Sequence, residues 1–94
     1  MSDVITKAIE GLSAKVSSFD GVAKFVIPGE GAIMIDQSGV RAGDEEADVT
    51  LTAEAEVFRA ILDGEMNPTA AFMTGKLSVD GNMGLAMQLG AVLG

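Results

Sequence analysis

The segment at residues 83–93 constrains the fold of this chain more than any other. It reads MGLAMQLGAVL, carries no charge, and has Gln88 as its one clearly polar side chain. A helix of this sequence is apolar nearly all round, so it should be buried on more than one side. One side can face a sheet. We expect the other side either to line an apolar cavity or to meet a second copy of the chain, since adaptable methionine side chains suit both.

Composition excludes several classes of function. The chain of 94 residues has no Cys, His, Trp or Tyr. Disulfide frameworks, thiol nucleophiles, zinc sites built on Cys or His, and Ser-His catalysis are therefore absent, and aromatic platforms for single-stranded nucleic acid are not expected. The net charge of −8 also makes nucleic acid and anionic bilayers unfavourable partners.

No targeting or membrane-spanning segment is visible. No apolar run approaches the ~20 residues that cross a bilayer, and the beginning, MSDVITKAIEGL, lacks a basic region followed by an apolar one. We therefore expect one domain over residues 1–94, located in the cytoplasm, with no signal peptide and no stable membrane insertion.

Hydrophobic periodicity predicts an α+β fold with helices on one sheet. Ile5, Ile9, Leu12 and Val16 form one stripe of a first helix. Asn67-Pro68 marks another helix start, because Pro is preorganised for the first helical position. The expected elements after the first helix are strands at 22–27, 32–36, 40–42 and 48–53, a helix over about 53–63 capped by Thr52, the helix from Pro68, a strand at 76–80 and a helix at 83–93.

Residues 44–65 hold eight carboxylates against the single Arg59. Their spacing does not match a calcium-binding loop, so we interpret them as a solvated acidic face. Asp36 and Asp80 stand in or at the end of strands and are weak candidates for an enzyme that uses carboxylates alone. We expect no catalytic residue, no metal site and no cofactor.

The stretch GEMNPTAAFMTGKLSVDGNMGLAMQL, at residues 64–89, resembles the lipid-binding domain of the sterol carrier protein 2 (SCP2) family. That family carries the block G-[KE]-x-N-P-x-x-A-F-x-x-G-K-[LI]-x-[VI]-x-G-N-x-x-x-A-x-x-L, which this chain fills without a gap. The preceding stretches VAKFVIPGEGAIMIDQSG and ADVTLTAEAEVFRAILDGE agree more loosely. The resemblance thus covers essentially the whole chain.

The resemblance implies a five-stranded mixed sheet covered by helices, with a lipid tunnel between the sheet and the C-terminal helix. Ligands of the family are sterols, fatty acids, fatty acyl-CoA and phospholipids, and the tunnel wall performs no catalysis. The wall residues that it implies in this chain are Phe58, Leu62, Phe72, Met73, Met83, Met87 and Leu89.

Two departures refine this expectation. The chain stops at Gly94 without the peroxisomal tripeptide of eukaryotic members, and it is strongly acidic where those carriers tend to be basic. We therefore expect a compact prokaryotic-type member that binds a fatty acid, a fatty acyl-CoA, a sterol or an isoprenoid-like lipid, with an acyl chain, an acyl-CoA or an isoprenoid tail favoured, and that presents it to lipid-metabolising enzymes. The alternative is an interaction or dimerisation module that uses the same apolar final helix, so both a monomer and a homodimer remain open.

A tunnel also carries an energetic cost. An empty pocket of ~300 Å³ at roughly 24 cal/mol per Å³ would cost about 7 kcal/mol, a large part of the ~5–15 kcal/mol that stabilises a domain. We expect the free protein either to fold its final helix inward or to keep a bound lipid.

Overall fold

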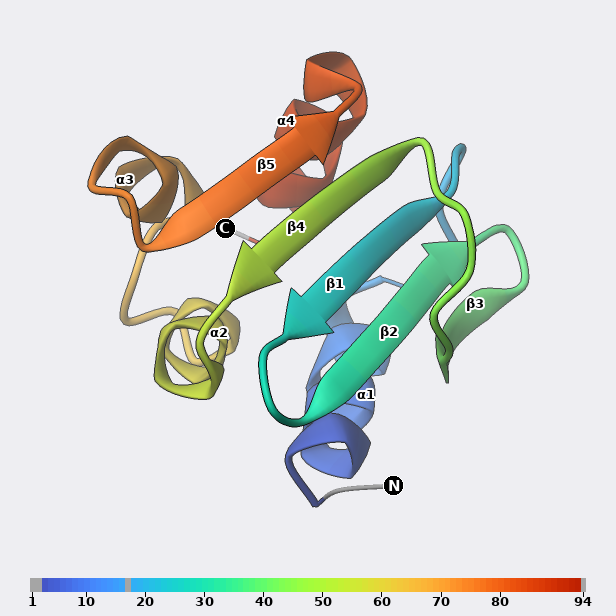
Figure 1. Cartoon of the computed structure of the whole chain (residues 1–94), viewed down its shortest axis with the longest axis horizontal. Helices are drawn as coiled ribbons and strands as arrows, with labels where there is room; N and C mark the ends of the chain where they lie inside the picture. Colours follow the sequence, from blue (N-terminus) through green and yellow to red (C-terminus); the bar gives the residue numbers. More distant parts are fainter. Residues whose placement is uncertain (1–2, 17, 94) are drawn as a thin grey trace.

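A computed structural model describes residues 3–16 and 18–93 of the chain. Helices and strands follow one another in the predicted order α-β-β-β-β-α-α-β-α (Figure 1). Their bounds are α1 (Asp3–Lys15), β1 (Ala23–Ile27), β2 (Gly31–Asp36), β3 (Gly39–Ala42), β4 (Val49–Ala53), α2 (Ala55–Leu62), α3 (Pro68–Met73), β5 (Leu77–Gly81) and α4 (Met83–Leu93).

The five strands form one sheet in the order β3-β2-β1-β4-β5. The central pair, β1 and β4, is parallel, and the other neighbouring pairs are antiparallel. Phe25 stands in the middle of this sheet, opposite Ile33 of β2 and Leu51 of β4. The α+β class and the five-stranded mixed sheet are therefore confirmed.

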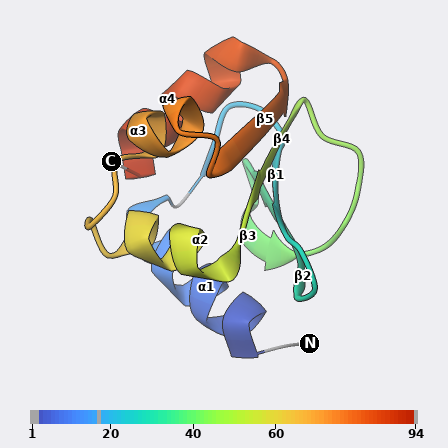
Figure 2. The same cartoon turned by 60° about the vertical axis from the view of Figure 1, so that its left-hand side comes forward.

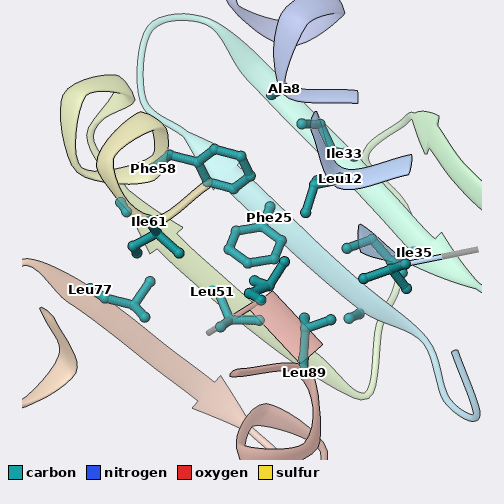
Figure 3. Packing of buried hydrophobic residues seen from close by; sticks show 14 of the residues in the cluster. Ala8, Leu12, Phe25, Ile33, Ile35, Leu51, Phe58, Ile61, Leu77 and Leu89 are labelled. Carbon is teal, nitrogen blue, oxygen red and sulfur yellow. The ribbon is translucent and has the colours of Figure 1, made fainter. Parts of the chain in front are cut away.

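One face of the sheet carries the core. The helices lie behind the sheet in the view of Figure 1, and strand residues that point toward them alternate as buried positions. Phe25 and Phe58 pack edge to face with ring centroids 4.6 Å apart, at the centre of the cluster in Figure 3. Leu12 of α1, Ile61 of α2 and Leu89 of α4 join the same cluster.

The opposite face has no helix over it, but one stretch of chain crosses it. Met34 of β2 is fully buried there, because the segment at 43–46 passes close above it. The Cγ of Met34 lies 3.0 Å from the position that a Cβ would take at Gly43. Ion pairs of Lys24 with Asp44 (2.9 Å) and of Arg41 with Glu45 (3.4 Å) attach this segment to the sheet.

The helices form two pairs (Figure 2). In one pair α1 packs on α2 and on β2 and β3, and in the other α3 packs on α4 beside β5. No described helix is long and apolar enough to cross a membrane.

The start of α2 corrects one prediction. Thr52 does not cap this helix, because β4 continues to Ala53 through its pairing with β5. The N-cap residue is Glu54, whose side chain makes no capping hydrogen bond. The predicted end of α2 at Gly64 is confirmed. Gly64 has a φ of 79°, in the left-handed region that suits glycine after a helix.

Candidate functional site

The exposed apolar side chains gather on two helices. Among the described residues, every large hydrophobic side chain that is exposed belongs to α3 or α4. Neither helix contains a charged residue. We call these five side chains the α3–α4 surface. They are Phe72 (41% exposed), Met73 (78%), Met83 (45%), Met87 (73%) and Val92 (45%).

Helix α4 has one buried side, not two. Ala86, Leu89 and Leu93 pack into the core, at the i, i+3 and i+7 positions of a helical stripe. Met83 and Met87 lie one turn apart and are exposed. In the single chain the other side of α4 is therefore exposed, and its coverage by a ligand or by a second copy stays a prediction.

Helices α3 and α4 face each other across a close approach. The Cβ of Pro68 lies 3.7 Å from the position that a Cβ would take at Gly90. Phe72 follows Pro68 by one turn on α3, and Met87 precedes Gly90 by nearly one turn on α4. Phe72 and Met87 are both exposed beside this contact. Neither Pro68 nor Gly90 was among the predicted wall residues.

Two asparagines fix where these helices begin. The Asn67 side chain accepts hydrogen bonds from the amides of Thr69 (2.8 Å) and Ala70 (3.3 Å), as expected of an N-cap. The Asn82 side chain accepts one from the amide of Leu85 (3.1 Å) at the start of α4. The backbone amide of Asn82 also donates to the Asp48 carbonyl (2.9 Å), which ties this point to the beginning of β4.

The far end of α4 has a weaker attachment. The ammonium group of Lys15 donates to the Leu93 carbonyl at 3.4 Å, and Leu93 itself is buried. Gly84 and Gly90 within the helix each cost roughly 1 kcal/mol of helix propensity relative to Ala. The hydrogen bonds at the beginning of α4 are therefore shorter than the one at its end, where the buried side chains of Leu89 and Leu93 provide the attachment.

A separate groove lies between α1 and α2. Its volume is about 820 Å³, and its lining includes Val4, Gly11, Phe58 and Leu62. The Cδ1 of Leu62 comes within 3.1 Å of the Cβ position at Gly11, so the two helices are closely packed there. The charged groups that line the groove are Asp3, Lys7, Glu56, Arg59, Asp63 and Glu65. With four carboxylates against two cations, this groove is unfavourable for an anionic headgroup.

The seven predicted wall residues thus occupy three places. Four are exposed on the α3–α4 surface. Phe58 and Leu89 are core residues, and Leu62 is half-buried beside the α1–α2 groove. The structure does not bring all seven around one enclosed cavity.

The carboxylates do not converge. Among the residues that the structure describes, no group of three or more acidic side chains could hold a metal ion. Asp36 binds the Arg41 guanidinium (2.8 Å) and the Ser38 amide (2.8 Å). These two hydrogen bonds hold the pKa of the Asp36 carboxyl below its usual range. An ion-paired carboxylate of this kind is ionised over the whole neutral range, so it suits a structural role better than proton transfer.

Comparison with known proteins agrees with this geometry. The family model described as the SCP-2 sterol transfer family matches residues 4–94. Hydroxysteroid dehydrogenase-like protein 2 of Xenopus tropicalis is 39% identical over 94% of the chain, which spans only 24% of that relative. Human sterol carrier protein 2 is 52% identical over 46 residues, which are 49% of the chain and 8% of the human protein.

Solved structures show the same fold. The crystal structure of sterol carrier protein 2 like 2 from Aedes aegypti matches with a TM-score of 0.79 and 26% identity, over 95% of each chain. A second Aedes aegypti structure, of sterol carrier protein 2 in complex with palmitate, matches with a TM-score of 0.76 and 22% identity over 99% of this chain and 96% of that one. This chain belongs to the SCP-2 sterol transfer family.

Proposed function

We propose that this chain is a non-catalytic lipid-binding protein that takes up one long apolar molecule, such as a fatty acid, between the sheet and α4. The observation that carries this proposal is the α3–α4 surface. Large apolar side chains that are exposed together on uncharged helices mark a candidate binding site on a small protein. Here they lie on the two helices that cover β4 and β5, directly above the core.

The energetics favour exchange of protein side chains for ligand. The inner side of α4 is occupied by Leu89 and Leu93, so a ligand must displace them. Exposing two leucines costs about 1.5–3 kcal/mol each, while ten buried methylenes of a ligand contribute about 8 kcal/mol. A long hydrocarbon chain therefore compensates for the movement of the helix, and a short one does not.

The attachment of α4 suggests how it moves. Its beginning is held by Asn82, through the Asp48 carbonyl and the Leu85 amide. A side chain at Gly81 would clash with the carbonyl of Asp48, so that junction is also sterically fixed. We infer that α4 pivots at Asn82 and that its end, near Leu93, moves outward. Phe58 and Leu89 then line the inside, and Phe72, Met73, Met83 and Met87 lie around the opening.

Relatives support the choice of ligand and setting. A family member of the same fold is known as a complex with palmitate, a C16 fatty acid. Other relatives are far longer proteins, one of them named as a dehydrogenase-like protein. Presentation of a lipid to an enzyme of lipid metabolism is the role that fits both.

The sharpest test is a reversible lock on α4. The distance of 3.7 Å between the Cβ of Pro68 and the Cβ position at Gly90 is close to the mean of ~3.8 Å found in disulfides. The chain has no native cysteine, so a Pro68→Cys/Gly90→Cys double variant can form only this intramolecular pair. We expect the oxidised protein to exchange palmitate at least about tenfold more slowly than the reduced protein.

The redox comparison and a measurement of bound lipid each give a decisive result. The reduced double variant is the matched control, because it carries the same two substitutions. Native mass spectrometry of the wild type, followed by organic extraction, shows whether one lipid per chain is bound. Equal exchange in both redox states, or no lipid bound at any concentration, contradicts the proposal.

The alternative is a dimerisation or interaction module. The same α3–α4 surface favours it, because an uncharged apolar patch also fits a second copy. A native mass of a ligand-free dimer would support this alternative over the carrier.

A further inference from the structure

The side chains of this protein that oxidants can modify are its methionines. The sequence has six methionines and no Cys, His, Trp or Tyr. A two-electron oxidant such as hydrogen peroxide therefore has thioether sulfurs as its targets, and each reaction converts an apolar side chain into a polar sulfoxide. The positions of the methionines thus decide what oxidation does to the molecule.

Exposure divides the described methionines into distinct groups. Met73 of α3 and Met87 of α4 are the most exposed, at 78% and 73%. Met34 is fully buried under the chain segment that crosses the far face of the sheet, and Met66 packs half-buried against the core. Oxidation follows the access of the oxidant to sulfur, so Met73 and Met87 react first and Met34 last.

We propose that Met73 and Met87 are reversible oxidation sites, and that their conversion to sulfoxides by hydrogen peroxide lowers the uptake of lipid. This inference rests on the proposed lipid-binding function and names a regulation of that site. The switch acts through the polarity of α3 and α4 and leaves the core intact.

The oxidation step needs only the thioether and the peroxide. A lone pair of the sulfur attacks one oxygen of hydrogen peroxide, an S–O bond forms and the O–O bond breaks. The two protons of the peroxide leave with its other oxygen as water. The sulfur loses two electrons and the peroxide gains them. A methionine sulfoxide reductase, with a thiol as electron donor, returns the thioether and releases the added oxygen as water.

The fold tolerates sulfoxides at these two positions. Because Met73 and Met87 are exposed, each new oxygen remains in water and no polar group is buried. The side chains that α4 packs into the core are Ala86, Leu89 and Leu93, which peroxide does not modify. A sulfoxide at the buried Met34 would instead place a polar group in a closed site, and its burial prevents that reaction.

Lipid uptake is more sensitive than the fold. In the proposed function Met73 and Met87 lie around the opening that α4 creates. Helices α3 and α4 carry no charged side chain, so a sulfoxide is a large change in their polarity. A hydrocarbon ligand that passes a sulfoxide displaces its bound water without offering a hydrogen bond, which is unfavourable. Oxidation therefore opposes entry of the ligand.

The first experiment measures where the native chain is oxidised. The whole protein is treated with hydrogen peroxide, and peptide mass spectrometry follows each methionine with time. We expect Met73 and Met87 to oxidise about tenfold or more faster than Met34, while the circular dichroism spectrum stays unchanged. Oxidation of Met34 at the same rate, or loss of the helical signal, overturns the proposal.

The second experiment measures uptake of an anthroyloxy-labelled fatty acid before and after oxidation. Peroxide should slow uptake by the wild type about fivefold or more, and methionine sulfoxide reductase should restore it. A Met73→Leu/Met87→Leu variant keeps apolar side chains without sulfur, so its rate should not change on treatment. A Met73→Gln/Met87→Gln variant carries polar groups at both positions and should be slower than the leucine variant without any peroxide.

A buried control separates these positions from the other methionines. Met34→Leu conserves side-chain volume in the core and should remain as sensitive to peroxide as the wild type. Each variant is compared with its own untreated sample, so a change in its starting rate does not affect the result.

Failure of this inference is distinguishable from failure of the proposed function. If the untreated wild type takes up no labelled fatty acid, the proposed function fails, and the regulation fails with it. If the untreated protein takes up the ligand and oxidation at Met73 and Met87 leaves the rate unchanged, only the regulation is overturned. The same holds if the leucine variant is slowed by peroxide as much as the wild type.

Discussion

The two helix pairs cover the same face of one sheet in different ways. In the α1–α2 pair, α1 packs on β2 and β3 and α2 places Phe58 against Phe25 of β1. None of the large apolar side chains of this pair is exposed among the described residues. The α3–α4 pair covers β4 and β5 and carries all five exposed ones. The first pair completes a core, while the second leaves apolar area in contact with water. This difference teaches that a fully covered core and water-exposed apolar area lie in separate halves of a very small domain.

A matched pair of leucines can break this comparison. Leu12 of α1 and Leu89 of α4 are both fully buried, so truncation to Ala removes the same atoms from each half. Leu12→Ala should lower the free energy of unfolding by about 3–5 kcal/mol, and Leu89→Ala by about 2–3 kcal/mol, because a hinged helix can settle into the cavity. Urea denaturation followed by circular dichroism measures both.

Adding a ligand sharpens the comparison of these two leucine variants. Saturating palmitate should recover much of the loss in Leu89→Ala, since a ligand that binds the native state can occupy the vacated volume. It should stabilise Leu12→Ala no more than the wild type. Equal losses and equal recovery in the two variants would show that the halves are not distinct.

Removing the N-cap of α3 should have a smaller effect on stability, confined to the half that contains α3 and α4. Asn67→Ala removes the acceptor for two backbone amides, those of Thr69 and Ala70, and should cost about 1 kcal/mol. Amide hydrogen exchange should quicken in α3 and remain unchanged in α1. The conservative control Asn67→Asp keeps an acceptor oxygen and should behave like the wild type.

The smallest expected effect is on the stability of the folded chain at low pH. It concerns Asp36, in the half of the molecule that α1 and α2 cover. Hydrogen bonds from Arg41 and from the Ser38 amide lower the pKa of Asp36 in the folded state. The folded pKa lies below the unfolded one, so the contribution is present at neutral pH. It is lost as the pH falls from the unfolded pKa through the lower folded pKa.

Asp36→Asn should therefore lose less stability than the wild type between neutral pH and about pH 3, as read from urea midpoints. Asp80→Asn, at the other edge of the sheet and without an ion-pair partner among the described residues, is the control. Unchanged palmitate affinity in Asp36→Asn is also expected. A weakened affinity would show that this ion pair affects ligand binding. That result would contradict the distinction between the two halves.

The sequence predicted the elements well because local signals decide them. Asn67-Pro68 starts α3 at the expected residue, and the alternation of Val49, Leu51 and Ala53 gives β4. Thr52 failed as a cap because the cross-strand partner Ser78, distant in the sequence, extends the strand past it. Tertiary pairing overrides a capping propensity in this way.

The site was harder to predict for a related reason. Periodicity identifies Met83 and Met87 as neighbours on a helix, but exposure depends on what lies opposite, which only the folded chain determines. Met34 illustrates the same limit, because it is buried on the far face of the sheet under the segment at 43–46 rather than with the other methionines. The contact of Pro68 with Gly90 depends on how α3 and α4 pack together, and no local pattern specifies that pairing.

The parallel pairing of β1 with β4 has a consequence for the nascent chain. During synthesis β1 can form a hairpin with β2 at once, but its other edge has no partner until residues 49–53 have been made. An unpaired, apolar central strand is a template for aggregation. The residues made just before its partner are Asp44, Glu45 and Glu46, and like charges at such a point keep waiting chains apart. We therefore expect the acidic segment that later lies over Met34 also to oppose association between unfinished chains.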